Sequence, residues 1–166
     1  LLWVFCGAVN TTPQMGTISI IPSGVTVDRV VSLFTEYNFE KYFFNSFVYA
    51  VAATGISLLF NSMAAYAFAR LSFPGRDKIF ALYLGTMMIP FSIIMMPLYL
   101  MIREMGLNNS LWALILPGMS GAYGVFMLRQ FFVGIPGDLE EAARIDGLGY
   151  WGIYTRIVLP LSKPIL

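Results

Sequence analysis

FFNSFVYAVAATGISLLFNSMAAYAF, residues Phe43–Phe68, contains no charged side chain and lies between Lys41 and Arg70. A helix needs about 20 apolar residues to cross the ~30 Å hydrocarbon core of a bilayer. A helix also bonds all its backbone polar groups internally, which lipid requires because it offers no hydrogen-bond partners. This stretch therefore predicts a transmembrane helix.

Two further charge-free stretches follow, and they predict spans at about Ile79–Met101 and Ser110–Leu128. Buried helices of a soluble protein are the alternative, but three such stretches in a row are not expected there. We expect an all-α, polytopic transmembrane helical bundle.

The composition agrees with this class, since 58% of the residues are hydrophobic and only 11% are charged. The net charge of +1 provides no basic surface for nucleic acid. The chain has a single cysteine, Cys6, and no histidine, so neither a cysteine metal cluster nor a histidine base is expected. The acidic residues Asp77 and Glu104 stand alone, and no phosphate-binding GxxxxGK[ST] loop is present. We expect no enzyme activity, no bound metal and no bound cofactor.

The two ends of the chain suggest a fragment. Leu1–Val9 is apolar but too short to span a bilayer, and no basic segment precedes it as in a signal peptide. We interpret Leu1–Val9 as the tail of a truncated transmembrane helix and Lys163–Leu166 as the start of a further span. The remainder divides into an extracytoplasmic segment at residues 10–42 and a core at residues 43–166.

Lysine and arginine positions predict the orientation. Two crossings separate Arg70–Lys78 from Arg129–Lys163, so both segments must lie on one side of the membrane. Together they carry seven of the ten basic residues. Basic residues are concentrated in cytoplasmic loops. We therefore predict that both segments are cytoplasmic and that residues 10–42 face outward.

One short helix is expected in the outer segment. Proline and glycine interrupt the chain up to Gly24, and an amphipathic pattern follows at Val27–Tyr37. Thr26 or Asp28 is expected to cap this helix, because short polar side chains accept hydrogen bonds from the first backbone N–H groups.

The stretch PGDLEEAARIDGLGYWGIYTRIVLP, Pro136–Pro160, predicts a helix-turn-helix on the cytoplasmic face. Acidic residues near Pro136 favour a helix start, where the helix dipole is positive. Arg144 favours the opposite end, and Gly147 can adopt the left-handed conformation that terminates a helix. A second helix is expected at about Tyr150–Ile157.

The first of these helices could dock on a partner protein. Ala142 and Ala143 are small enough for another surface to approach closely, and Glu141 and Ile145 share a face because they are one turn apart. A solvated loop is the alternative. Glu140 points about 100° away from Glu141 around the helix, so Glu140→Ala is expected to be milder than Glu141→Ala.

The sequence here resembles the EAA motif of binding-protein-dependent ABC permeases. The matching elements are Glu141-Ala142-Ala143, Gly147 and Ile157-Val158-Leu159-Pro160. Further elements are similar to the carbohydrate-importing, maltose-permease-like branch: Asp146-Gly147, Ile135-Pro136, Asn45-Ser46, Tyr66-Ala67-Phe68-Ala69-Arg70, Phe73-Pro74-Gly75 and Leu111-Trp112-Ala113. The resemblance covers about Tyr42 to Leu166.

The resemblance implies a type I importer fold, in which two permease subunits pair and two cytoplasmic ATPase subunits use ATP and Mg. It also implies an extracytoplasmic solute-binding protein, a surrounding of membrane lipid, and a coupling helix seated in an ATPase cleft. Glu141 is expected to meet a basic residue of the ATPase, and Gly147 to permit the turn. The expected coupling residues are Glu141, Ala142, Ala143, Ile145, Asp146, Gly147, Ile157, Leu159 and Pro160.

Polar and proline residues inside the spans are candidates for the substrate pathway. A polar side chain in hydrocarbon faces water or another helix, and interrupted helices often line transport routes. This reasoning selects Asn45, Asn61, Pro90 and Pro97. Helix-packing hydrogen bonds and simple kinks are the alternatives.

The expected function is import of a carbohydrate by alternating access. Three alternatives remain open at this stage: a permease for a polyamine, peptide or oxyanion, an intramembrane enzyme, and a truncated membrane protein that does not transport.

Overall fold

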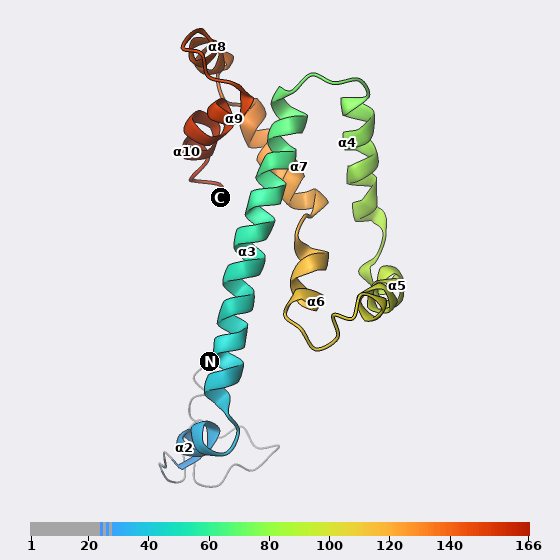
Figure 1. The fold of residues 1–166 in the computed structure, drawn as a ribbon, viewed down its shortest axis with the longest axis vertical. Coiled ribbons are helices and arrows are strands. Elements are labelled where there is room, and N and C mark those ends of the chain that lie inside the picture. The colour runs from blue at the N-terminus through green and yellow to red at the C-terminus, as the bar shows by residue number, and fades with distance from the viewer. Residues whose placement is uncertain (1–23, 25, 27) are drawn as a thin grey trace. The chain divides into compact units, whose positions relative to one another are not determined.

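The computed structural model describes residues 24, 26 and 28–166, and every regular element there is a helix (Figure 1). Contacts divide the chain into two units, Leu1–Val48 and Tyr49–Leu166. The expected helix tail at Leu1–Val9 and residues 10–23 of the expected outer segment lie outside the described residues. The helices are α2 (Asp28–Thr35), α3 (Phe39–Arg70), α4 (Arg76–Gly85), η1 (Thr86–Met88), α5 (Phe91–Glu104), α6 (Trp112–Ile115), η2 (Leu116–Gly118), α7 (Ala122–Val133), α8 (Gly137–Ile145), α9 (Tyr150–Ile153), the π-helix η3 (Tyr154–Val158) and α10 (Leu159–Leu161).

In the first unit, α2 confirms the short helix predicted near Val27–Tyr37. Thr26 Oγ1 accepts a hydrogen bond from the backbone N–H of Asp28 at 3.2 Å, which identifies Thr26 as the capping side chain. Asn38 has a φ of 49° and turns the chain from α2 into α3. Across this turn the rings of Phe34 and Phe39 meet edge to face, with centroids 5.4 Å apart.

Helix α3 runs for 32 residues and contains the whole of the predicted span Phe43–Phe68. Among the described residues it is the one continuous helix that is long and apolar enough to cross a membrane. Its sequence explains this length, because no proline interrupts it and its charges, Glu40, Lys41 and Arg70, lie at its two ends.

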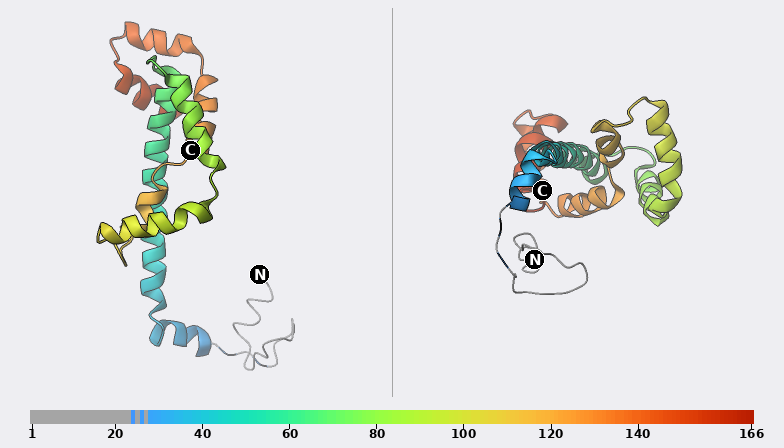
Figure 2. Two further views of the ribbon diagram at one scale, coloured as in Figure 1. Left: turned by 90° about the vertical axis from the view of Figure 1, so that its right-hand side faces the viewer. Right: turned by 90° about the horizontal axis from the view of Figure 1, so that it is seen from below.

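The second expected span, Ile79–Met101, is interrupted at Pro90, one of the two prolines singled out from the sequence. Helices α4 with η1 and α5 meet at a bend of 99° (Figure 2). The break lies at Pro90, which has no N–H to continue the helix and disfavours helical geometry in the preceding Ile89. Ile89 is accordingly extended, with φ −84° and ψ 115°. Pro97 lies within α5, which continues past it.

The third expected span, Ser110–Leu128, is also interrupted. Helix α6 passes into the short 3₁₀ helix η2, which contains Pro117 and Gly118, and α7 begins only after the extended residue Gly121. Helix α7 then continues to Val133, beyond the predicted end. This segment therefore forms two separate helices in place of the single helix expected from the sequence.

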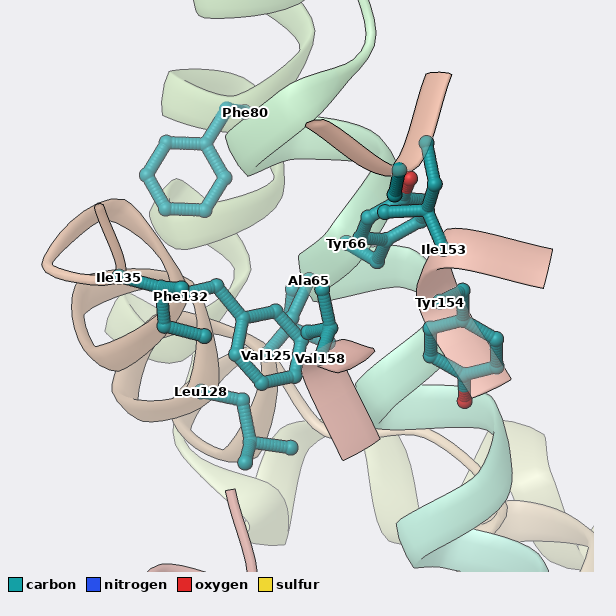
Figure 3. Packing of buried hydrophobic residues seen from close by; sticks show 11 residues of the cluster. Ala65, Tyr66, Phe80, Val125, Leu128, Phe132, Ile135, Ile153, Tyr154 and Val158 are labelled. Atoms are coloured by element: carbon teal, nitrogen blue, oxygen red, sulfur yellow. The ribbon is translucent and has the colours of Figure 1, made fainter. Parts of the chain in front are cut away.

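The core of the second unit lies where α7 and the C-terminal helices pack on the end of α3 that carries Arg70. Ala65, Val125, Phe132 and Val158 gather there and are fully buried (Figure 3). Phe80 from α4 joins the same cluster.

Outside this core, many large apolar side chains are exposed. Met88 at the end of η1 is 85% exposed and Leu82 on α4 is 77% exposed. Helix α5 exposes Phe91, Ile93 and Met96 to a similar degree. Soluble monomers rarely expose contiguous apolar surfaces of this kind. The pattern is typical of helices that face lipid or another helix.

Candidate functional site

Helix α8 begins and ends where its sequence predicts. Pro136 precedes its first residue with φ −56° and ψ 132°. Asp138 and Glu140 lie in the first turn and Arg144 in the last, so side-chain charges of the favourable sign lie at both ends of the helix dipole.

The turn after α8 is a Schellman motif centred on Gly147. The N–H of Leu148 donates to the Ala143 carbonyl at 2.9 Å, and the N–H of Gly147 donates to the Arg144 carbonyl at 3.0 Å. Gly147 has a φ of +84°, the left-handed conformation that the motif requires. A Cβ at this position would meet no atom within 4 Å, so only the backbone conformation selects glycine. This confirms the turn predicted at Gly147.

Helix α8 has one face buried and one face open. Glu140 and Ala143 are 6% and 4% exposed, so they point toward the core. Ala142 and Glu141 are exposed, and Ile145 is 87% exposed. The two alanines therefore differ: Ala142 is available to a partner, while Ala143 packs inside the chain's own core.

Arg70 at the end of α3 holds the buried carboxylate of Glu140. Arg70 Nε lies 3.0 Å from Glu140 Oε1, and both side chains are largely buried. The Nη2 atom of the same guanidinium donates to the carbonyl oxygens of Phe132, at 2.5 Å, and Ile135. One arginine thus joins the end of α3, the end of α7 and the first turn of α8.

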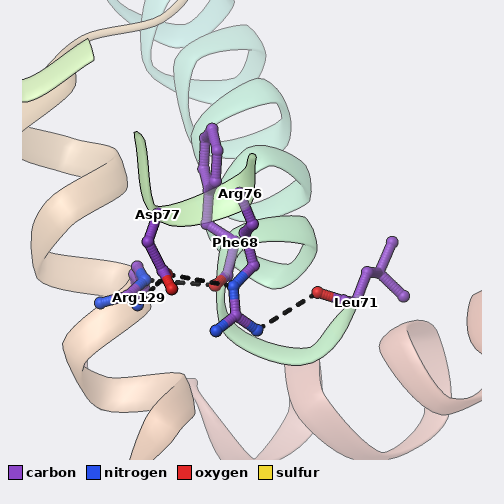
Figure 4. A network of polar contacts seen from close by, with 5 residues as sticks. All are labelled: Phe68, Leu71, Arg76, Asp77 and Arg129. Atoms are coloured by element: carbon purple, nitrogen blue, oxygen red, sulfur yellow. Dashed lines mark hydrogen bonds and ion pairs between the residues drawn. The ribbon is translucent and has the colours of Figure 1, made fainter. Parts of the chain in front are cut away.

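A second arginine makes the reverse connection, from α7 to α3. Arg129 Nε donates to the Phe68 carbonyl at 3.2 Å, and its Nη2 lies 3.8 Å from Asp77 (Figure 4). Its guanidinium also lies 4.3 Å from the centre of the Phe80 ring. The last carbonyls of a helix lack partners within it and attract cations. Arg70 of α3 donates to the Phe132 carbonyl near the end of α7, and Arg129 of α7 donates to the Phe68 carbonyl near the end of α3.

These contacts hold the loop after α3 and the helix-turn-helix at the same end of α3 (Figure 1). Arg70–Lys78 and Arg129–Lys163 were predicted to lie on one side of the membrane, and the contacts between these segments agree with that. The pairing of Arg70 with Glu140 was not predicted. The spacing of Glu140 and Ala143, three residues apart on one helix face, was the available signal.

The π-helix η3 is tied to α3 by Tyr154. Its hydroxyl lies 2.8 Å from Ser62 Oγ, and this hydroxyl pair is buried. The Tyr154 ring packs between the rings of Tyr66 and Trp151, with both centroid distances 5.3 Å. Single-turn π-helices often occur at functional sites. Here Tyr154, the first residue of the π-helix, contacts Ser62 and Tyr66 in the C-terminal third of α3.

The C-terminal residues of the motif contribute to packing. Ile157 and Leu159 are partly buried against the core cluster, and Pro160 is exposed at the start of α10. Asp146 and Gly147 are exposed at the turn. The nine predicted coupling residues thus divide into an outward group (Glu141, Ala142, Ile145, Asp146, Gly147 and Pro160) and an inward group (Ala143, Ile157 and Leu159).

Among the pathway candidates, Asn61 is buried in a helix contact. Its Oδ1 accepts a hydrogen bond from the Gly121 N–H at 2.9 Å, at the start of α7, and its Nδ2 donates to Ser57 at 3.0 Å. A Cβ on Gly124 would lie 2.6 Å from Asn61 Nδ2, so the two helices are in close contact. Asn61 therefore makes the helix-packing hydrogen bonds of its alternative interpretation, while its contact with substrate stays a prediction.

The other three pathway candidates differ from Asn61. Asn45 is exposed on α3, and Pro90 and Pro97 lie at the bend and within α5. Contact with substrate stays a prediction for each of them.

Residues 57–166 match the family model described as binding-protein-dependent transport system inner membrane component. The arabinooligosaccharides transport system permease protein of Halalkalibacterium halodurans is 40% identical over 90% of this chain and 54% of its own length.

Two further relatives cover almost the whole chain. The lactose transport system permease protein of Rhizobium radiobacter is 31% identical over 98% of this chain and 59% of its own length. The diacetylchitobiose uptake system permease protein of Streptomyces coelicolor is 32% identical over 99% of this chain and 55% of its own length. The chain therefore spans little more than half the length of these relatives.

Proposed function

Because the chain belongs to the family of binding-protein-dependent transport system inner membrane components, we propose that it forms part of the pathway of an ATP-driven importer. It is a permease component that takes up a carbohydrate by alternating access. A separate ATPase hydrolyses ATP, using Mg, and docks on α8.

The open face of α8 is the observation that carries the docking proposal. Ile145 is a large apolar side chain that is 87% exposed, and Glu141 is exposed one turn before it. An isolated surface helix gains nothing from exposing isoleucine, whereas a groove on a partner would bury it. The opposite face is held inside the chain by Glu140 and Ala143, so the helix is presented in a defined orientation.

The surface of the second unit supports the remaining partners. Exposed apolar side chains on α4 and α5, such as Leu82 and Met96, need lipid or another membrane helix to cover them. A second permease subunit and membrane lipid are the occupants we propose. A solute-binding protein outside the membrane delivers the substrate, as the family description implies.

Carbohydrate is the substrate class that the relatives favour. The three relatives described above are named for transport or uptake of arabinooligosaccharides, lactose and diacetylchitobiose. All three substrates are sugars with more than one ring, and we propose a substrate of this class.

The proposed location is the bacterial cytoplasmic membrane, with Arg70–Lys78 and Arg129–Lys163 in the cytoplasm. Seven basic residues lie in these two segments, against three elsewhere in the chain. Docking on a cytoplasmic ATPase requires the same orientation, because α8 belongs to the second of these segments.

The test uses the full-length subunit, expressed with its cognate partner permease and ATPase. Glu141→Ala and Ile145→Ala, separately and together, are compared with Glu104→Ala. Glu104 is a matched control because it is an exposed acidic residue at the end of α5. The measured quantities are the amount of ATPase that copurifies with the permease and the uptake of labelled oligosaccharide in reconstituted vesicles.

We expect the double variant to lose most of the copurified ATPase and of the uptake, and Glu104→Ala to retain both. Equal ATPase recovery from all variants would contradict docking through α8. If the parent complex imports no oligosaccharide but imports another solute, the carbohydrate assignment is wrong and the docking proposal stands.

A further inference from the structure

Glu140 is a buried acidic residue that cannot contact a partner docked on the open face of α8. It is 6% exposed and lies in the first turn of α8, directly before the exposed Glu141. A carboxylate out of water is costly unless it is paired and hydrogen-bonded. Its position therefore needs an explanation other than contact with a partner protein.

Arg70 supplies the pairing and does more than neutralise the charge. Its Nε lies 3.0 Å from Glu140, while its Nη2 donates to the carbonyls of Phe132 and Ile135. The planar guanidinium has five donors in a fixed geometry, so it can reach an acid on one side and carbonyls on the other. Lysine has a single ammonium group and cannot make this set of contacts at once.

The pair determines which face of α8 is open. Adjacent residues on a helix differ by about 100°, so the inward position of Glu140 turns Glu141 away from the core. Ile145 lies one turn after Glu141 and shares the outward face. Rotation of α8 by one residue would bury Glu141 and withdraw Ile145.

We propose that Arg70 is a positioning residue that links the orientation of the ATPase-docking helix to α3, the membrane-spanning helix. This inference rests on the proposed function, because it assumes that α8 docks on an ATPase. Movement of α8 on the ATPase is transmitted to α3 through the Arg70–Glu140 pair and through the carbonyls at the end of α7. The same pair also keeps Glu141 and Ile145 facing outward.

The test compares Arg70→Lys and Glu140→Gln in the full-length subunit, within the assembled and reconstituted complex. Arg76→Lys is the matched control, because Arg76 lies in the adjacent loop and pairs with the exposed Asp77. Three quantities are measured: ATPase copurification, the thermal midpoint of the complex, and ATP hydrolysed per oligosaccharide imported. The last quantity separates coupling from assembly.

We expect Arg70→Lys and Glu140→Gln to raise the ATP hydrolysed per import by about 2- to 30-fold, the range typical of residues that link two sites. Complexes recovered with the parent's ATPase content should show this change, and Arg76→Lys should not. If uptake and hydrolysis fall in parallel with the thermal midpoint while their ratio is constant, Arg70 is only a structural residue and the proposal is wrong. If the parent complex binds no ATPase, the proposed function fails instead, so the two failures are distinguishable.

Discussion

Arg70 and Glu140 are 70 positions apart in the sequence, yet Arg70 Nε lies 3.0 Å from Glu140 Oε1 and both side chains are largely buried. This contact fixes α8 against the end of α3. It separates the roles of two adjacent acids, because Glu140 stabilises the chain's own structure while Glu141 remains free for a partner.

Glu140→Ala should destabilise the subunit more than Glu141→Ala. Removing one partner of a buried ion pair costs about 3–5 kcal/mol, because the other charge is left buried and unpaired, whereas exposed pairs contribute about 0–1 kcal/mol. The milder effect expected from the sequence for Glu140→Ala concerns docking on a partner, and it stays a prediction. Thermal unfolding of the purified full-length subunit measures the difference in stability. Equal midpoints for the two variants would show that Arg70 finds another partner.

Gly147→Ala should lower stability by about 1–2 kcal/mol, because an L-residue is strained at a φ of +84°. Gly147→Val should cost more, since a β-branched side chain is least tolerated there. Gly149→Ala is the control, because Gly149 has a φ of −76° and open space at the Cβ position. The measured quantities are the thermal midpoint and the ATPase recovered with the subunit. Similar losses at both glycines would contradict the backbone argument.

Tyr154→Phe and Tyr66→Phe should change the free energy of unfolding by amounts that differ in sign or in size. Tyr154→Phe removes the buried contact with Ser62 and should cost about 0.5–1.5 kcal/mol. The Tyr66 hydroxyl is buried without a hydrogen-bond partner among the described residues, so its removal should be neutral or stabilising. Thermal unfolding of the two variants measures the difference. A larger loss for Tyr66→Phe would indicate that its hydroxyl is bonded in the full-length subunit.

Gly124→Ala should disrupt the contact between α7 and α3. The added Cβ would lie 2.6 Å from Asn61 Nδ2, which must move and weaken the bond that Asn61 accepts from Gly121. Overpacking of this kind costs about 1–3 kcal/mol. Gly55→Ala on α3 is the control, since a Cβ there meets nothing within 4 Å. Equal stability of both variants would show that Asn61 adapts without loss.

Membrane orientation can be tested by labelling single cysteines after Cys6 is replaced. Cysteines at Lys78 and Arg144 should be shielded from an impermeant thiol reagent in intact cells, whereas one at Asn108 should react. All three positions are exposed in the structure, so burial within the chain does not explain shielding. Labelling of Lys78→Cys from outside would reverse the proposed orientation.

The sequence by itself determined the features that depend on near neighbours. The charge-free run before Arg70 predicted α3 because the hydropathy of consecutive residues decides whether a helix can lie in lipid. Thr26 and Gly147 were recognised because caps and turns are set by residues a few positions apart. Pro90 located the break between α4 and α5 for the same local reason.

Only the tertiary structure decided what depends on residues far along the chain. The angle of 99° at Pro90 is not set by proline alone, which fixes only the local backbone. The hydrogen bond that Asn61 accepts from the Gly121 N–H, 60 residues away, was likewise one of two alternatives that the sequence left open. The helical period and the EAA resemblance already distinguished Glu141 from Glu140, but the sequence could not show that Glu140 is buried. Its partner Arg70, 70 positions away, decides this, because a charge removed from water must lie beside its partner.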